Sequence, residues 1–314
     1  MVKITETDKN EIKSKKKLGD ILFENLTLLF ALVLVGLVIY ICIEMFSDSY
    51  LSREKFGFGF IFSNEWNPVK EEFGALAFIY GTIVSSILAL VLSLPVSIGV
   101  AVFLSEIVHK SVKAPISFLI EILAAIPSII FGFWGIFVLV PFMRNTVQPF
   151  LQTTLGFLPF FQGSMYGTGL LTASIILAIM ITPIISSITR DILKAIPVSQ
   201  REAAYALGAT RWEGIKMALL NARSGILGAS VLGLGRAIGE TMAVTMVIGN
   251  KSQIMASIFE PAYSMASVIA NELNEASGSL HTSSLIEVGL ILFGVTFIIN
   301  SLARILIYSV TRKA

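Results

Sequence analysis

The stretch "FGALAFIYGTIVSSILALVLSLPVSIGVAVFL", residues 73–104, contains no charged side chain in 32 positions. A helix needs about 20 apolar residues to cross the hydrocarbon core of a bilayer. This stretch is long enough to cross with a tilt or to extend beyond the bilayer. Pro95 lies inside it and removes one backbone donor, so we expect a kink there. The fold class that the stretch predicts is all-α and transmembrane.

The whole chain has the composition of an integral membrane protein. Of its 314 residues, 55% are hydrophobic and 14% are charged, and the mean hydropathy is +0.82. A soluble domain is about a quarter charged. The formal net charge of +2 argues against nucleic acid as a partner. Cys42 is the single cysteine, so the chain has neither an intrachain disulfide nor a thiol cluster for a metal. His109 and His281 fall in polar connections, where we expect solvated side chains.

Six stretches are long and apolar enough to span the membrane as helices. Pro127 falls inside the third stretch and is expected to kink it. The predicted spans are residues 26–46, 73–104, 115–143, 170–189, 222–249 and 285–308.

The lysines and arginines between the spans predict the orientation. The connections on the amino-terminal side carry 16 of them, against 5 on the other side. Because positive charge accumulates on the cytoplasmic side, both termini are predicted to be cytoplasmic. The chain thus reads as a multi-pass protein of the cytoplasmic (inner) cell membrane. Residues 1–25 form a basic cytoplasmic tail, residues 26–46 the first transmembrane helix, and residues 73–308 a core with five further spans, which includes a cytoplasmic loop at 190–221.

This cytoplasmic loop, which contains "REAAYALGATRWEGI", predicts two short helices joined by a turn. A helix begins near Ser199, Gly208 ends it, and Thr210 caps a second helix that runs toward Leu220. Apolar side chains on the first helix suit docking into a groove of another protein. An amphipathic connector lying along the membrane fits the pattern equally well. The apolar residues concerned are Ala203, Ala204, Ala206 and Leu207.

The same segment resembles the EAA loop of binding-protein-dependent ABC importer permeases. Glu202, Ala203, Ala204 and Gly208 match the motif residues. The resemblance implies that these residues form the coupling helix that sits in a cleft of a separate ATPase subunit. The chain contains no phosphate-binding G-x-x-x-x-G-K-[ST] loop of its own. It is therefore not expected to be an enzyme, and ATP and Mg would be bound by the partner ATPase.

A second stretch, "GLGRAIGETMAV" (residues 233–244), places Arg236 and Glu240 inside the fifth span. On an uninterrupted helix the two side chains lie about 40° apart on one face. Gly235 and Gly239 form a GxxxG step that allows close approach of another helix. Charged residues in spans usually line pathways, although a salt bridge that fixes helix register is the alternative. A guanidinium fork matches a tetrahedral oxyanion, and a carboxylate can accept a hydrogen bond from hydrogen phosphate, which sulfate cannot donate.

Residues 233–250 resemble the fifth-span signature of phosphate ABC importer permeases of the PstC type. The resemblance implies that Arg236 and Glu240 act in phosphate passage; Thr241 belongs to the same motif. It also implies a homologous permease (PstA type), two ATPase subunits (PstB type) and an extracytoplasmic phosphate-binding protein (PstS type), with membrane lipid around the spans. A permease for molybdate or sulfate, and an ion-coupled secondary carrier with Glu240 as proton site, are the alternatives. Glu106, Glu287 and Arg304 lie near span ends and receive no role.

Overall fold

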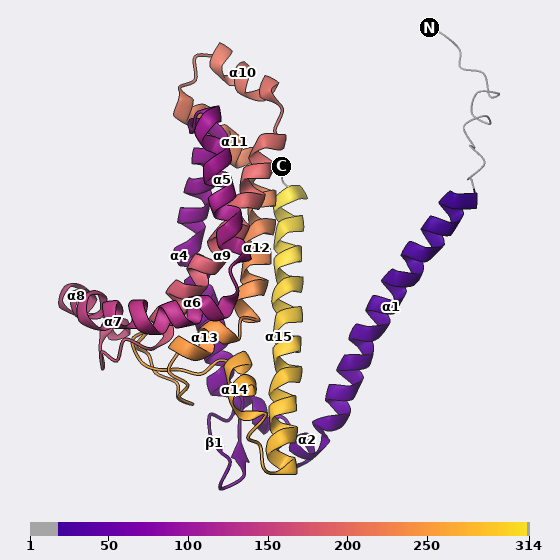
Figure 1. Ribbon diagram of the computed structural model, residues 1–314, viewed down its shortest axis with the longest axis vertical. Helices are drawn as coiled ribbons and strands as arrows, with labels where there is room; N and C mark the ends of the chain where they lie inside the picture. Colours follow the sequence, from indigo (N-terminus) through magenta and orange to yellow (C-terminus); the bar gives the residue numbers. More distant parts are fainter. Residues whose placement is uncertain (1–17, 313–314) are drawn as a thin grey trace. The chain divides into compact units, whose positions relative to one another are not determined.

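The computed structural model describes residues 18–312 of the chain, which divides into two units at the bond between Asp48 and Ser49 (Figure 1). The first unit is the single helix α1 (Leu18–Asp48). Its apolar window has a mean hydropathy of 3.0, and apolar side chains cover it on all sides, as expected for a membrane span. The helix extends the predicted span 26–46 at both ends. Of the predicted basic tail, residues 1–17 lie outside the described residues.

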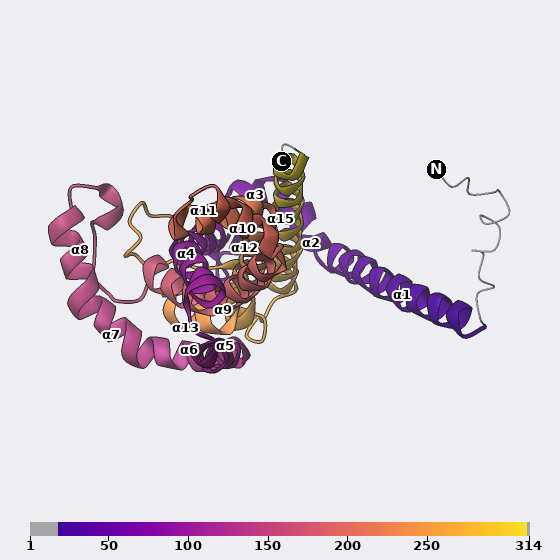
Figure 2. The ribbon, with the colours of Figure 1, turned by 90° about the horizontal axis from the view of Figure 1, so that it is seen from above.

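Long helices lying side by side form the second unit (Figures 1 and 2). Its centre is α9 (Leu170–Ala195), whose apolar window is 67% buried inside the protein. Packed around it are α4 (Leu76–Val102), α5 (Lys110–Ala125) and α12 (Arg223–Ile238), while α15 (Ser279–Arg312) packs against α12. Within residues 18–312, five helices are long and apolar enough to span a membrane, or six if α11 and α12 together make one bent span. The predicted all-α transmembrane class is confirmed.

Hydroxyl groups tie α4 to the central helix inside this apolar surrounding. The hydroxyl oxygens of Ser93 and Thr182 lie 2.9 Å apart, and Ser97 donates to the backbone oxygen of Thr182 at 3.3 Å. These polar atoms are satisfied by one another, so their burial carries little desolvation cost. The two helices are therefore held in a fixed register along their length.

The third span differs from the prediction. A single kinked helix was expected over residues 115–143, but α5 ends at Ala125, and Ile126 and Pro127 are extended, with ψ of 128° and 138°. The residue before a proline is pushed out of the α region, which explains the break. Helical turns resume at Ser128 and run crosswise to α5 (Figure 1). They comprise α6 (Ser128–Trp134), η2 (Gly135–Leu139), α7 (Val140–Phe142), η3 (Met143–Val147) and α8 (Gln148–Leu155).

Short elements close the end of the unit that carries α14 (Met265–Glu272). Residues 256–264, which lead into α14, are not helical. Burial raises the pKa of Tyr263, in the loop before α14, to about 12, so its hydroxyl stays protonated. The other elements at this end are α2 (Tyr50–Phe56), α3 (Gly59–Phe62), β1 (Trp66–Asn67), β2 (Glu72–Phe73) and the turn η4 (Pro159–Phe161).

His281 is part of the packing at the α14 end, and the expectation of a solvated loop histidine is wrong. Its ring lies parallel to that of Phe73, with 5.3 Å between centroids. Its Nε2 atom lies 3.1 Å from Oε2 of Glu272, the same oxygen that accepts a 2.8 Å hydrogen bond from the Trp66 indole. The antiparallel pair β1–β2 is therefore joined to both α14 and α15 through one carboxylate.

Gly81 of α4 lies very close to the backbone of the loop before α14. A Cβ atom added there would fall on the backbone oxygen of Tyr263, whereas one added to Gly99 of the same helix would meet open space. We expect Gly81→Ala to lower the free energy of unfolding by about 1–3 kcal/mol because backbone must shift. Gly99→Ala, the matched control, should be neutral or slightly stabilising. Thermal unfolding of the purified protein in detergent measures both, and equal melting temperatures would contradict the expectation.

Candidate functional site: the coupling loop and the α12–α13 break

The loop between the fourth and fifth spans folds into the two predicted short helices, α10 (Val198–Ala206) and α11 (Arg211–Asn221). Gly208 turns the chain between them with a φ of +85°, a conformation that favours glycine. Thr210 caps α11 in a capping box: its hydroxyl accepts from the Glu213 amide, and Glu213 accepts from the Thr210 amide at 2.7 Å. Local sequence signals therefore determine this helix–turn–helix.

The α10–α11 loop presents apolar side chains away from the rest of the unit. Leu207 is 90% exposed and Trp212 66% exposed. The motif residues Glu202, Ala203 and Gly208 are also exposed, while Ala204 is half-buried. An exposed patch of large apolar side chains marks an interaction surface. The sequence-based prediction included Leu207 but missed the other large members of the patch, which are Val198, Tyr205, Trp212 and Leu220.

Arg201 of α10 fixes this loop to the helical core. Its Nη2 atom donates to Oε1 of Glu106 and to the backbone oxygen of Leu193, both at 2.7 Å. Glu106 belongs to η1 (Phe103–Ile107), the last turns of the long helix that begins with α4. The two charged side chains are only 15% and 13% exposed. The ion pair, of sequence separation 95, thus connects α10 to the long helix that begins with α4, and the hydrogen bond to Leu193 connects it to α9. No pattern in the sequence predicted a role for Glu106.

A cluster of charges surrounds the same end of α9. Arg190 lies 3.0 Å from Asp191 and 3.7 Å from Glu121, and Lys194 lies 3.6 Å from Asp191. Burial, and then the positive charges of Lys194 and Arg190, lower the pKa of Lys113. Charged groups of both signs therefore lie close together where the long helices meet the α10–α11 loop.

The fifth span is broken where the sequence predicted an uninterrupted helix over 222–249. Helix α12 ends at Ile238, and α13 (Met242–Val247) begins after a non-helical segment. The last backbone bonds of α12, from Gly239 to Gly235 and from Glu240 to Ala237, are long at 3.4 Å. Non-helical backbone at membrane depth is tolerated only where protein covers it or where it borders water. The break is therefore a candidate for a point on a polar pathway.

Arg236 lies in the last turn of α12 and Glu240 in the break itself, and the expected pair on one helix face is not formed. Among the ion pairs of residues 18–312, none joins them. Instead, Oε1 of Glu240 accepts a 3.4 Å hydrogen bond from the Ala243 amide at the start of α13. Thr241 donates to the Gly239 carbonyl, also at 3.4 Å. The guanidinium of Arg236 is exposed and, among the described residues, has no hydrogen-bond partner. It is free to bind an anion.

The close packing of α12 uses a different row of glycines from the predicted GxxxG step. Cβ atoms added to Gly225 and Gly233 would lie 2.6 Å and 2.7 Å from Ile192 and Ile185 of α9. A Cβ atom on Gly235 would meet only Asn300 Oδ1, at 3.8 Å, and one on Gly239 only the Gly235 oxygen of its own helix. Close approach of another helix at Gly235 and Gly239 stays a prediction.

Comparison with known proteins places this geometry in a family. Residues 93–312 match the family described as "Binding-protein-dependent transport system inner membrane component". The chain is 45% identical to the phosphate transport system permease protein PstC of Mesorhizobium japonicum, over 94% of this chain and 92% of that protein. It is 46% identical to the PstC protein of Haemophilus influenzae, over 91% and 92% of the two chains.

A solved structure shares the fold at low sequence identity. An inward-facing crystal form of the MetNI methionine ABC transporter covers 76% of this chain and 94% of its own, with a TM-score of 0.52 and 19% identity. The family match extends over most of the chain and includes both the α10–α11 loop and the α12–α13 break. The chain therefore belongs to the family of binding-protein-dependent transport system inner membrane components, and within it to the PstC type of permease.

Proposed function

We propose that this chain is the permease subunit of an ATP-driven phosphate importer, in which Arg236 binds phosphate during its passage. The observation that carries the proposal is an exposed guanidinium without a partner among residues 18–312, one turn from a break in a membrane-spanning helix. A charge placed in a span costs about 2.5–3.5 kcal/mol, so a structural role alone would favour leucine there. The relatives named as phosphate permeases, at 45% and 46% identity, support phosphate as the anion.

Three regions of the molecule are proposed as contacts for the partner subunits. A homologous permease of PstA type would complete the pathway beside the exposed Arg236, and a phosphate-binding protein of PstS type would deliver phosphate at the α14 end. Two ATPase subunits of PstB type, which bind ATP and Mg, would receive the apolar patch around Leu207. In this arrangement the α10–α11 end and both termini are cytoplasmic, as the lysine and arginine count predicts.

Because Arg236 and Glu240 do not pair with each other, each has its own role in this proposal. The guanidinium fork of Arg236 offers two parallel donors to phosphate oxygens. The Glu240 carboxylate, which accepts a hydrogen bond from the Ala243 amide, would accept a second one from hydrogen phosphate. Because the two side chains do not neutralise each other, an arriving anion replaces water rather than a protein partner. Thr241 belongs to the non-helical segment and leaves its hydroxyl near the same turn.

Two alternatives differ in measurable ways. A permease for molybdate or sulfate would have the same fold and the same dependence on an ATPase. An ion-coupled secondary carrier would work alone, with Glu240 as its proton site. Membership of a binding-protein-dependent transport family favours an ATPase-dependent mechanism over the carrier.

Reconstitution tests the proposal. The complex is co-purified from native membranes, its subunits are identified, and radiolabelled phosphate uptake into proteoliposomes is measured with binding protein and ATP. We expect uptake that needs ATP, that excess sulfate or molybdate does not reduce, and that this subunit alone does not support. Uptake inhibited by molybdate or sulfate would identify another oxyanion permease, and ATP-independent uptake by the subunit alone would identify a carrier.

A further inference from the structure

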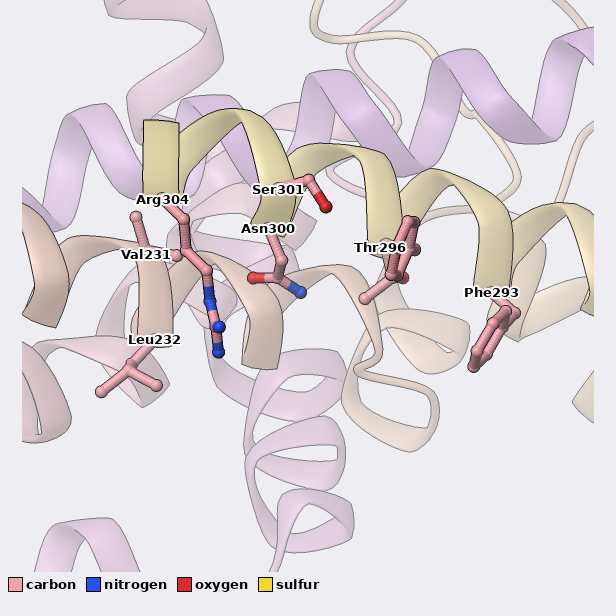
Figure 3. Close-up of a pocket in the computed structure, with 8 residues that line it drawn as sticks. Val231, Leu232, Phe293, Thr296, Asn300, Ser301 and Arg304 are labelled. Carbon is pink, nitrogen blue, oxygen red and sulfur yellow. The ribbon is translucent and has the colours of Figure 1, made fainter. Parts of the chain in front are cut away.

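A cavity of about 550 Å³ lies between α12 and α15 (Figure 3). Helix α12 contributes apolar side chains to it, whereas α15 contributes both aromatic and polar ones. Arg304 and Asn300 extend from α15 toward α12. The lining residues are Val231, Leu232, Phe293, Thr296, Phe297, Asn300, Ser301 and Arg304.

Three of the polar side chains in this α12–α15 cavity have no partner in the part of the chain that the structure describes. Thr296 is satisfied, since its hydroxyl donates to the Leu292 oxygen at 2.7 Å. Asn300, Ser301 and Arg304 make no side-chain hydrogen bond or ion pair with any residue from 18 to 312. They lie in an apolar helix with a mean hydropathy of 2.2, where unpaired polar groups are costly. A partner from outside this chain would offset that cost.

The cavity lies next to Arg236, toward the α10–α11 end. Asn300 Oδ1 is 3.8 Å from the Cβ position of Gly235, so Asn300 is level with the turn that carries Arg236. The two helices run antiparallel (Figure 1), so Arg304, about 6 Å further along α15, is level with Leu232. Leu232 precedes Arg236 by one helical turn and so lies on the same stripe of α12. Arg304, which lines the cavity, is therefore one turn nearer the α10–α11 end than the turn of α12 that carries Arg236.

We propose that the α12–α15 cavity is a second oxyanion-binding position on the conduction path, which phosphate occupies after Arg236 on its way to the cytoplasm; this inference rests on the proposed function. Arg304 supplies a forked donor, Asn300 an amide donor and Ser301 a hydroxyl donor, which together match a tetrahedral oxyanion. No carboxylate lines the cavity, so it accepts an anion without requiring a proton on it. The opposite wall is apolar and offers no donor, which limits affinity and allows release.

The single native cysteine makes a direct test feasible. In a Cys42→Ser background, Ser301→Cys gives the chain one thiol, inside the cavity. The complete complex is reconstituted, and the rates of modification by anionic and cationic methanethiosulfonate reagents are compared. We expect the anionic reagent to be favoured by about tenfold, since positive charge in a cleft concentrates anions. Adding Arg304→Gln should remove the preference, and inorganic phosphate should slow modification. Leu302→Cys, exposed on α15 outside the cavity, is the matched control and should show neither effect.

The remaining outcomes separate this inference from the proposed function. A thiol without anionic preference, in a complex that imports phosphate, overturns the cavity site and leaves the function intact. A preference that sulfate or molybdate, but not phosphate, suppresses keeps the site and overturns phosphate as the cargo. Protection that depends on anionic phospholipid in the vesicles and not on free phosphate identifies a lipid headgroup and overturns the site. Loss of assembled complex in Arg304→Gln, restored by Arg304→Lys, identifies a carboxylate of the partner permease and also overturns it.

Discussion

Replacing Arg236 with glutamine is expected to lower phosphate uptake by about 100-fold while the complex still assembles. Loss of a preorganised charged donor to an oxyanion costs about 2.7–4 kcal/mol, which corresponds to a factor of 10²–10³. Arg236 is exposed and has no hydrogen-bond partner among the residues described. Its replacement therefore leaves no buried group unsatisfied, and the folded subunit should be as stable as the wild type.

Two further variants show whether the loss is caused by the missing guanidinium of Arg236 in particular. Arg236→Lys keeps the charge but loses the fork, so we expect an intermediate loss of about tenfold. Arg144→Gln removes an exposed arginine from η3, away from the break, and should transport at the wild-type rate. The measurements are initial uptake into proteoliposomes, the yield of assembled complex and its ATPase rate. Normal uptake by Arg236→Gln would show that phosphate does not pass this guanidinium.

The sequence predicts those parts of the fold whose signals are local. Gly208 and the Thr210–Glu213 spacing predict the end of α10 and the start of α11, and the structure has both within a residue or two. The apolar runs likewise predict where the long helices lie. Each signal acts through neighbouring backbone, so no information about distant residues is needed.

The breaks inside apolar runs could not be predicted in the same way. Pro95 and Pro127 give the same sequence signal, yet α4 continues through Pro95 and the chain becomes extended at Pro127. Hydropathy at Gly239 and Glu240 suggested a continuous helix because it records solvent preference and not backbone direction. The outcome depends on packing against other helices, which a single sequence does not specify.

The same distinction between local signals and long-range packing applies to the site residues. Arg236 and Glu240 could be identified because a charge inside an apolar run is visible in the sequence. The helix break that begins after Arg236 and contains Glu240 was not visible, and neither was the pairing of Arg201 with Glu106. The cavity around Arg304 was missed because that residue lies near a span end, where reaching the interface is the ordinary explanation. Only the antiparallel contact of α12 and α15 brings it beside the Arg236 turn.

The Arg201–Glu106 ion pair is expected to transmit movement of α10 to the long helices, so breaking it should uncouple ATP hydrolysis from transport. Both side chains are mostly buried, and removing one partner of such a pair costs about 3–5 kcal/mol because the other is left uncompensated. Arg201→Met also deprives the Leu193 carbonyl of its donor, so helix α10 loses both of the contacts that Arg201 makes to the core. We expect uptake to fall at least tenfold in Arg201→Met and in Glu106→Gln, while ATP is still hydrolysed.

The double variant Arg201→Met with Glu106→Met separates transmission from stability. Replacing a buried ion pair with apolar side chains is often neutral for stability, so its melting temperature should return toward the wild-type value. Uptake should stay low, because methionine contacts can slide where a 2.7 Å charged hydrogen bond cannot. The exposed pair Lys194–Asp191 is the matched control, and Lys194→Met should change neither property, since such pairs contribute about 0–1 kcal/mol. If uptake recovered together with stability, the ion pair would serve only to hold α10 in place, and the transmission of movement would have to run through the apolar contacts of α11 and α12.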